Sequence, residues 1–363
     1  MKSFKIILIL IFIFILDIIF TKSYQFYKSI KFSKGNYMAL NNTYHHELKK
    51  NYKGKGRQEE IIFTNKYGFI QLEKQSKINL KDKNNIILIG DSFTQGAGVD
   101  YRNTFAGILT NRLKDKKNLI NMSAISYSPS IYFYKTKFFI ENYNMKFSDM
   151  YVFIDISDPY DELYRYEVKN ERVINRKNLN NPFINNFYDK IIHYIKKFVS
   201  NNTTILYFTL RSIKDVLNKK NIDEQLFYEK YGFIINHQAN IWTFNKKYFE
   251  KEGYKGIELS KKYLKLLKEL LDKNNANLTI VVYPWPGQIF RDDKNKKQSS
   301  IWQKWAIKNE VKFIDISKLF FREGNRSELD RLKIIDKYYL EKDMHFNQNA
   351  HKIVAVELLK HIN

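Results

Sequence analysis

IILIGDSFTQGAGVD, residues 86–100, decides the fold of this chain. Its first four residues form a short apolar run that ends at glycine and aspartate, as a fully buried strand does when it stops at a turn. Ser92 then stands where a helix begins, and the free amides of a helix start can stabilise negative charge on a nearby oxygen. Two interpretations of Ser92 fit this stretch: a nucleophile, or a capping serine at an ordinary strand-to-helix turn.

Strand and helix patterns alternate on both sides of this stretch. Further strands are predicted at residues 118–121, 150–154, 278–283 and 311–314, and helices at 104–113, 131–143, 302–309 and 349–359. This alternation indicates crossover units and a parallel sheet that is covered on both faces. Ligands bind open sheets of this kind beyond the carboxyl ends of the strands, so we expect the site at that edge.

The composition excludes several classes of function. The chain has 363 residues, of which 44% are hydrophobic, enough for one large domain or one domain with an insertion. A formal net charge of +24 would attract nucleic acid or an anionic surface. However, the lysines are spread along the chain without a basic stripe, so we expect no nucleic-acid partner. The absence of cysteine excludes disulfides, thiolate catalysis and cysteine-ligated zinc.

The N-terminus has the pattern of an export signal. Lys2 and Lys5 precede an unbroken apolar run at residues 6–16, and Asp17 separates this run from three more apolar residues. A buried core helix is the alternative, but apolar residues without amphipathic spacing disfavour it. Residues 21–23 make a poor cleavage site, so we expect an uncleaved single-pass membrane anchor whose following chain is extracytoplasmic, either periplasmic or extracellular.

The sequence divides into three expected segments. Residues 1–23 form the signal anchor, and residues 24–83 read as a polar stalk with short strands near 60–63 and 67–70. Residues 84–363 form the main domain, with an insertion at about 160–260 that has helical patterns near 189–199 and 260–272. An insertion between two core strands often acts as a lid or substrate platform, although these helices could equally be packing elements.

A serine nucleophile needs a base, and the base needs a carboxylate that orients it. His345 is one of seven histidines, and it follows Asp343 in the stretch DMHFN, residues 343–347, directly before the last predicted helix. A lone histidine is more often a solvated or core residue. The neighbouring acid and the position before a helix reverse that expectation, and they favour the nucleophile interpretation of Ser92.

GDSFTQG after a strand, together with Asp-x-His-x-Asn before the last helix, resembles the SGNH hydrolase superfamily, also called GDSL-like esterases and acyltransferases. The resemblance covers about residues 84–160 and 275–363. It implies a three-layer α/β/α sandwich with a mostly parallel, flavodoxin-like sheet of about five strands. It also implies that Ser92 is the nucleophile, His345 the base and Asp343 its partner acid. The family more often spaces the last two as acid-x-x-His, and here that earlier position is Lys342.

The resemblance also implies an oxyanion hole that combines the amide of Ser92 with donors from two further blocks. Ser123 in Asn121-Met122-Ser123 stands where the family often has the glycine of Asn-x-Gly, so its amide is the expected second donor. Ser157 stands where the third block usually carries an asparagine, and a hydroxyl has a shorter reach. Loss of one oxyanion donor typically raises the barrier by about 2.7–4 kcal/mol.

Substrate contacts are expected from side chains close to these blocks: Asp91, Asn121, Asp158 and Trp285. Trp285 belongs to YPWPGQ, residues 283–288, after a predicted strand. An exposed tryptophan there would suit a sugar ring or an acyl chain, whereas packing on the sheet edge is an equal alternative.

Four acids gather near the third block and read as a polar loop that lines a cleft: Asp155, Asp158, Asp161 and Glu162. A divalent-metal site would lack supporting histidines. We therefore expect neither a metal nor a cofactor.

Two classes of function follow. In the first, the chain is a serine esterase or O-acyltransferase that passes an acyl group, expected to be acetyl, from Ser92 to water or to a sugar hydroxyl. The family resemblance and the export signal imply an acylated envelope glycan or a small ester as substrate, and acyl-lipid hydrolysis is a rival within this class. In the second, the chain is a membrane-tethered binding or assembly protein with the same fold and little activity, as the altered second and third blocks suggest. The sequence does not indicate an oligomeric state.

Overall fold

The structure is a computed structural model that describes residues 2–33, 37–75, 78–114, 116–176, 195, 198–199, 201–207, 209–210, 222–292, 296–321 and 327–362. The chain divides into two compact units, one of Met1–Asn36 with Lys177–Tyr228 and one of Tyr37–Arg176 with Glu229–Asn363. The sheet and all the candidate site residues belong to the second unit. The helix expected at residues 189–199 lies mostly outside the described residues.

The first unit contains helix α1 (Lys2–Ser33), which carries the apolar run. Asp17 interrupts this run, and its side chain is buried. Its two carboxylate oxygens accept the backbone N–H groups of Ile205 at 2.9 Å and Leu206 at 2.8 Å, so the charge has partners within this unit. Within the described ranges, no helix is both long and apolar enough to span a membrane, so the expected membrane helix has no support here.

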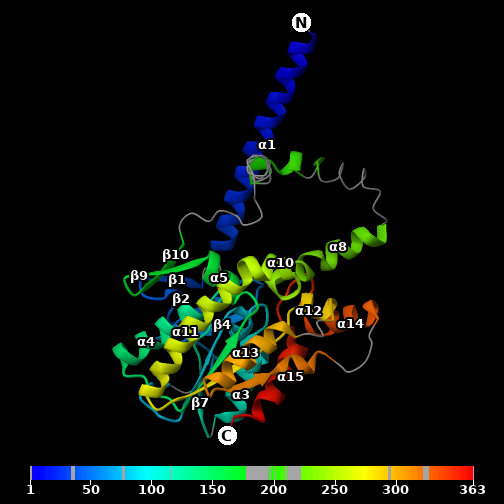
Figure 1. Cartoon of the computed structure of the whole chain (residues 1–363). Coiled ribbons are helices and arrows are strands. Elements are labelled where there is room, and N and C mark those ends of the chain that lie inside the picture. The colour runs from blue at the N-terminus through cyan, green and yellow to red at the C-terminus, as the bar shows by residue number, and fades with distance from the viewer. Residues whose placement is uncertain are drawn as a thin grey trace. The chain divides into compact units, whose positions relative to one another are not determined.

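The second unit is built on one eight-stranded sheet (Figure 1). In spatial order its strands are β12 (Lys312–Asp315), β11 (Asn277–Val282), β8 (Asp149–Ile154), β6 (Asn85–Ile89), β7 (Asn118–Asn121), β5 (Ile70–Gln71), β4 (Ile61–Thr64) and β3 (Lys53–Lys55). The first five are parallel. When these five strands are numbered 1 to 5 along the chain and read from β7 to β12, their order is 2-1-3-4-5. This is the expected flavodoxin-like order.

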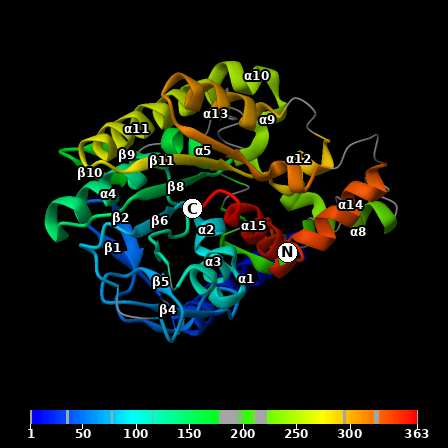
Figure 2. The ribbon, with the colours of Figure 1, turned by 90° about the horizontal axis from the view of Figure 1, so that it is seen from below.

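Helices cover both faces of the parallel strands (Figure 2). One face carries α4 (Pro129–Tyr143), α11 (Tyr254–Lys273) and α13 (Lys297–Lys308), and the other carries α3 (Phe105–Leu113) and α15 (Gln348–Leu359). Helix α11 shows why these segments are helical. Its buried residues recur every three or four positions and form one stripe: Ile257, Ser260, Leu264, Leu267 and Leu271. The expected α/β layers are therefore present.

Further helices, turns and hairpins make up the rest of the described chain. The remaining described elements are α2 (Ser92–Gln95), η1 (Tyr101–Asn103), α5 (Asp158–Tyr164), α8 (Ile222–Ile235), η2 (Gln238–Asn240), α9 (Ile241–Phe244), α10 (Lys246–Tyr248), η3 (Phe249–Gly253), α12 (Pro286–Phe290), η4 (Ile316–Leu319), α14 (Glu328–Tyr338), and the hairpins β1 (Met38–Asn41) with β2 (His45–Leu48) and β9 (Tyr166–Lys169) with β10 (Arg172–Asn175). The insertion at about 160–260 is thus not wholly helical, because it begins with α5 and the β9–β10 hairpin.

The expected stalk at residues 24–83 is wrong for residues 37–71, although the short strands expected near 60–63 and 67–70 are present as β4 and β5. Strand β5 pairs antiparallel with β7, and β4 and β3 continue the sheet beyond it. Ile62, Phe69 and Ile70 are buried, so this segment contributes to the core of the second unit. The sequence did not predict β3, because this strand has only three residues and buries none of its side chains.

A buried lysine supports the loop after β7. Lys135 on α4 is 1% exposed, and its ammonium group donates to Met122 O at 2.8 Å and to Tyr127 Oη at 3.0 Å. The rings of Tyr44, Phe69 and Tyr127 surround it with centroids 4.9–5.5 Å away. Burial lowers the pKa of Lys135 from 10.5 to about 7, although Glu47 opposes the shift.

Lys135 should make the protein more stable as the pH rises from 7 to 10. In this window the unfolded chain keeps the lysine protonated while the folded protein releases the proton, so the free energy of unfolding rises by about 1 kcal/mol per pH unit. Urea unfolding at several pH values would measure this slope, and Lys135→Met should remove it. Lys137→Met is the control, because Lys137 is on the same helix but pairs with Glu171 at the surface. Equal slopes for wild type and Lys135→Met would contradict the prediction.

Candidate active site

Ser92 lies at the point where the strand order reverses. Strands β6 and β8 are neighbours, and the chain leaves both at the same edge of the sheet, towards Ser92 and Asp155 respectively. Gly90 makes the tight exit from β6 possible. A Cβ at this position would come within 2.2 Å of Thr94 Oγ1 and 2.9 Å of Phe153 Cβ, so a larger residue would push α2 away from the sheet.

The cap of helix α2 is Asp91, not Ser92. The Asp91 carboxylate accepts the backbone N–H of Phe93 at 2.9 Å, and it also accepts the Tyr283 hydroxyl at 3.1 Å. Burial and the neighbouring Asp155 raise the pKa of Asp91 well above its ordinary value. Capping is thus supplied by the preceding residue. The Ser92 hydroxyl lies 3.2 Å from Asp91 Oδ2 and, at a shorter distance, 2.8 Å from His345 Nε2.

Ser92, His345 and Asp343 form one hydrogen-bonded chain. The Ser92 Oγ lies 2.8 Å from His345 Nε2, and His345 Nδ1 lies 2.5 Å from Asp343 Oδ1. Asp343 Oδ1 also accepts the backbone N–H of His345 at 2.9 Å. Lys342 takes a positive φ of 56°, which makes the tight turn that lets an acid two residues before the histidine reach its ring. The three residues expected from the sequence are therefore in contact.

Surrounding elements hold the histidine loop in place. The loop connects α14 to α15, and Tyr339 and Phe346 form a bridge across it. Asn347 caps α15 by accepting the N–H groups of Asn349 and Ala350. The ring of Phe93 lies 4.9 Å from the ring of His345 and limits its movement on one side.

The electrostatics favour an ionised Asp343. Burial would raise the pKa of this carboxyl, but hydrogen bonds and charge from His345, with a further hydrogen bond from Gln58, lower it to about 2. At neutral pH the group is therefore a carboxylate that accepts the Nδ1 proton of His345. That arrangement leaves Nε2 as the acceptor for the Ser92 hydroxyl proton.

Two of the expected oxyanion donors form hydrogen bonds with acceptors inside the protein. The backbone N–H of Ser123 donates to the Asn121 side chain at 3.0 Å. The Ser157 hydroxyl donates to Asp155 Oδ1 at 2.6 Å, and its backbone N–H donates to the same oxygen at 2.7 Å. Because both groups bind acceptors of the protein itself, the assignment of Ser123 and Ser157 to an oxyanion hole is corrected.

Ser126, in the turn after β7, has a backbone conformation that the sequence did not indicate. It takes a positive φ of 58°, a conformation that costs a serine roughly 1–2 kcal/mol. Its carbonyl accepts the Tyr166 hydroxyl at 2.7 Å, and the preceding Ile125 N–H donates to Gln95 Oε1 at 2.9 Å, which ties this turn to α2. Among the described residues, the Ser126 N–H has no hydrogen-bond acceptor. A glycine would have been the sequence signal for this backbone conformation, and here it is absent.

The four expected substrate contacts are all buried, with side chains of Asp91, Asn121, Asp158 and Trp285 between 0% and 3% exposed. Trp285 stacks on Phe93 and donates its Nε1–H to Asp155 at 2.7 Å. Asn121 donates to Thr94 O at 2.8 Å, and Asp158 accepts the Tyr132 hydroxyl at 3.1 Å. These side chains support the site from within the core, so their assignment to substrate binding is corrected. For Trp285, packing on the sheet is the correct alternative.

The acidic cluster is internal rather than a cleft lining. Burial and the neighbouring Asp155 raise the pKa of Asp158 well above its ordinary value. Burial likewise raises the pKa of Asp161 to about 7, although Arg165 opposes it. Across the described part of the chain, no three histidine, aspartate or glutamate side chains are arranged to hold a metal ion.

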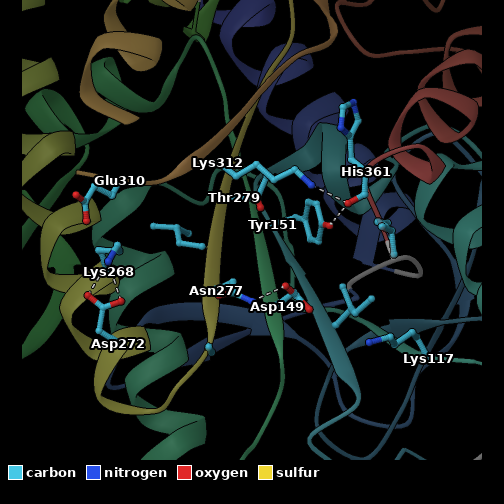
Figure 3. Close-up of a pocket in the computed structure, with 14 residues that line it drawn as sticks. Lys117, Asp149, Tyr151, Lys268, Asp272, Asn277, Thr279, Glu310, Lys312 and His361 are labelled. Carbon is cyan, nitrogen blue, oxygen red and sulfur yellow. Dashed lines mark hydrogen bonds and ion pairs between the residues drawn. The ribbon is translucent and has the colours of Figure 1, made fainter. Parts of the chain in front are cut away.

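A separate pocket of about 500 Å³ opens at the amino ends of the parallel strands (Figure 3). Asp149, Asn277 and Lys312 line it from the starts of β8, β11 and β12. Its polar groups pair with one another: Lys268 with Asp272, Asn277 with Asp149, and Lys312 and Tyr151 with His361 O. Its described lining offers no nucleophile beside a base, so the candidate active site remains at the opposite edge.

No family model matches the chain, and no curated protein matches it. Several solved structures are similar. An esterase from Pseudoalteromonas sp., in a structure inhibited by monoethylphosphonate, has 11% identity and a TM-score of 0.36 over 77% of this chain and 96% of that one. A catalytic mutant of an acetylxylan esterase from Geobacillus stearothermophilus has 8% identity and a TM-score of 0.40, over 79% and 97%. A member of the lipolytic protein G-D-S-L family from Veillonella parvula has 15% identity and a TM-score of 0.33, over 76% and 96%. At these values, function has to be argued from the site itself.

Proposed function

We propose that this protein is a serine ester hydrolase or O-acyltransferase. The observation that carries the proposal is the contact of Ser92 Oγ with His345 Nε2 at 2.8 Å, with Asp343 on the far side of the same ring. A hydroxyl is a weak nucleophile, and an imidazole held by a carboxylate is the arrangement that activates it.

The reaction proceeds through an acyl-serine. Ser92 Oγ attacks the ester carbonyl carbon while His345 Nε2 takes the hydroxyl proton, and the carbonyl electron pair moves onto the oxygen. The N–H groups of Ser92 and Ser126 are the donors proposed for this oxyanion. Collapse of the intermediate breaks the ester C–O bond, and the leaving alcohol takes the proton from His345. Water or a second alcohol, activated by His345 in the same way, then releases the acyl group.

A short acyl group on a glycan is the proposed substrate. A pocket of about 360 Å³ lies beside the catalytic loop, since Tyr339, Leu340 and Lys342 line it immediately before Asp343. Its polar side chains include Lys230, Tyr231 and Asp336, of which Asp336 pairs with the other two, and Ile234 and Ile335 stand beside them. A lining with this many polar groups suits hydroxyl groups better than a long acyl chain. This favours a sugar over a lipid substrate.

Acetate release from p-nitrophenyl acetate and from an acetylated glycan tests this proposal. We expect Ser92-dependent release with both compounds. Transfer of the acetyl group to an added unacetylated oligosaccharide would identify a transferase, whereas release unchanged by the acceptor would identify a hydrolase. Faster cleavage of long-chain than of acetyl esters would point to the lipid acyl hydrolase instead.

A binding or assembly protein with weak activity is the second candidate. It is favoured by the engagement of Ser123 N–H and Ser157 Oγ with internal acceptors, which removes two expected stabilisers of the oxyanion. Labelling with a fluorophosphonate probe distinguishes the two. A probe that labels a control esterase but neither the wild type nor its Ser92→Ala variant would support the binding protein.

From the sequence of residues 2–20 alone, we propose that the catalytic unit is extracytoplasmic. We further propose that these residues anchor it in the membrane. An alkaline phosphatase fused after residue 363, which is active only after export, would report the location. An inactive fusion in export-competent cells would contradict it.

A further inference from the structure

Gln58 reaches the candidate active site from a part of the chain that precedes the parallel sheet. It lies in the turn between β3 and β4, and its Nε2–H donates to Asp343 Oδ2 at 2.5 Å. The other oxygen of Asp343 already accepts the Nδ1 and backbone N–H groups of His345. The two oxygens of this carboxylate therefore have different partners, one on each side.

The turn that carries Gln58 is fixed by its own hydrogen bonds. The Gln58 N–H donates to Glu60 Oε2 at 2.7 Å, and the Gly56 N–H donates to Glu60 O at 2.7 Å. Glu60 is only 5% exposed. The Ile61 N–H donates to Asp100 Oδ1 at 2.8 Å, which ties the turn to the loop that follows α2. The backbone at Gln58 is thus fixed by hydrogen bonds, so less conformational entropy is lost when Gln58 binds Asp343.

Gly98 leaves the space that Gln58 occupies. It has a positive φ of 81°, and a Cβ there would come within 2.6 Å of Gln58 Oε1 and 2.5 Å of Leu340 Cδ1. Leu340 stands three residues before Asp343. The glycine in QGAGVD therefore allows the Gln58 turn, the Ser92 loop and the His345 loop to meet without a clash.

We propose that Gln58 is a positioning residue that holds the Asp343 carboxylate in the plane of the His345 ring. This inference rests on the proposed function, because it assigns Gln58 a role in orienting the base for Ser92. A neutral amide suits the task, since it gives up no proton between pH 4 and pH 10 and adds no net charge beside the carboxylate. Residues 53–64 are then part of the catalytic architecture.

Two substitutions test this role by their effect on the titration of His345. In Gln58→Ala, Asp343 loses one hydrogen-bond donor and becomes a stronger partner for a protonated His345 ring. We expect the midpoint of the His345 titration to move upwards by about 0.3–0.5 pH unit. Gln58→Glu places a second carboxylate beside the first, so a larger upward move of about one unit is expected. Histidine ring NMR measures both, with His345→Gln used to assign the signal.

The kinetic readout should change in parallel. We expect kcat for p-nitrophenyl acetate to fall about three- to tenfold in Gln58→Ala with little change in KM, and the acid limb of the pH profile to move with the NMR midpoint. Gln238→Ala is the matched control, because Gln238 is also an exposed glutamine with one side-chain partner, the Tyr160 hydroxyl. It should match the wild type in both measurements.

The NMR measurement distinguishes a failure of the Gln58 inference from a failure of the proposed function. If neither Gln58 variant moves the His345 midpoint while both melt within a few degrees of the wild type, the positioning role is wrong, whatever the activity. If the midpoint moves but the wild type has no Ser92-dependent activity, the Gln58 contact stands and the esterase proposal fails.

Discussion

Ser92→Ala should lower kcat for acetyl ester cleavage by about 10³-fold or more and abolish labelling by a fluorophosphonate. The variant lacks the only atom that can become acylated in the Ser92–His345–Asp343 chain. Binding of the ester and stabilisation of its carbonyl by backbone N–H groups would remain, so KM should change much less than kcat. Initial rates with p-nitrophenyl acetate, corrected for the uncatalysed reaction, measure the loss.

Ser123→Ala provides a matched control for this result. Ser123 is 1% exposed, and its hydroxyl has no hydrogen-bond partner among the described residues. Removing it should leave kcat within about twofold of the wild type, because the backbone N–H that donates to Asn121 is retained. Equal activity in Ser92→Ala and the wild type would exclude Ser92 as the nucleophile. A large loss in Ser123→Ala alone would restore a role for the second block.

The features that could be predicted from sequence are local ones. The run at residues 86–89 is buried on all sides, so its apolar pattern alone indicates a strand, and β8 and β11 are buried in the same way after their first residue. The contact of Asp343 with His345 depends on a two-residue spacing within one loop. Their contact with Ser92 followed because both stretches flank the carboxyl edge of one parallel sheet.

The features that could not be predicted depend on contacts between distant segments or on backbone conformation. Gln58 and Asp343 are 285 positions apart, and nothing in the residues around either one marks the other. The Ser126 turn has a conformation usually signalled by glycine, and its serine is held there by Tyr166 and Gln95. The same limit explains Trp285: a tryptophan after a strand looks exposed until Phe93 and Asp155 are seen to cover it.

Asp343→Asn should lower kcat/KM by about 10³–10⁴-fold at neutral pH while leaving the fold intact. The carboxylate accepts the proton on His345 Nδ1, and this fixes Nε2 as the nitrogen that accepts the proton of Ser92. An asparagine can donate its amide hydrogen to Nδ1 instead, which would place the ring proton on Nε2, where it faces Ser92 and blocks proton abstraction. Gln58 would then face the asparagine in place of a charged acceptor. Steady-state kinetics at pH 7–8 measure the loss, and formate should restore no activity because the asparagine leaves no space for it.

The stability of the wild type and of Asp343→Asn at acid pH distinguishes a loss of kcat/KM from misfolding of the variant. The pKa of Asp343 is lowered to about 2 in the folded protein, below the ordinary 3.8. The stability that this carboxylate contributes is therefore fully present above about pH 4 and is lost as the pH falls towards 2. Urea unfolding should show this loss in the wild type and a flatter dependence in Asp343→Asn, with similar stability for both near pH 2. An Asn variant with wild-type kcat/KM would show that the His345 tautomer does not depend on Asp343, and the proposed proton path would have to be abandoned.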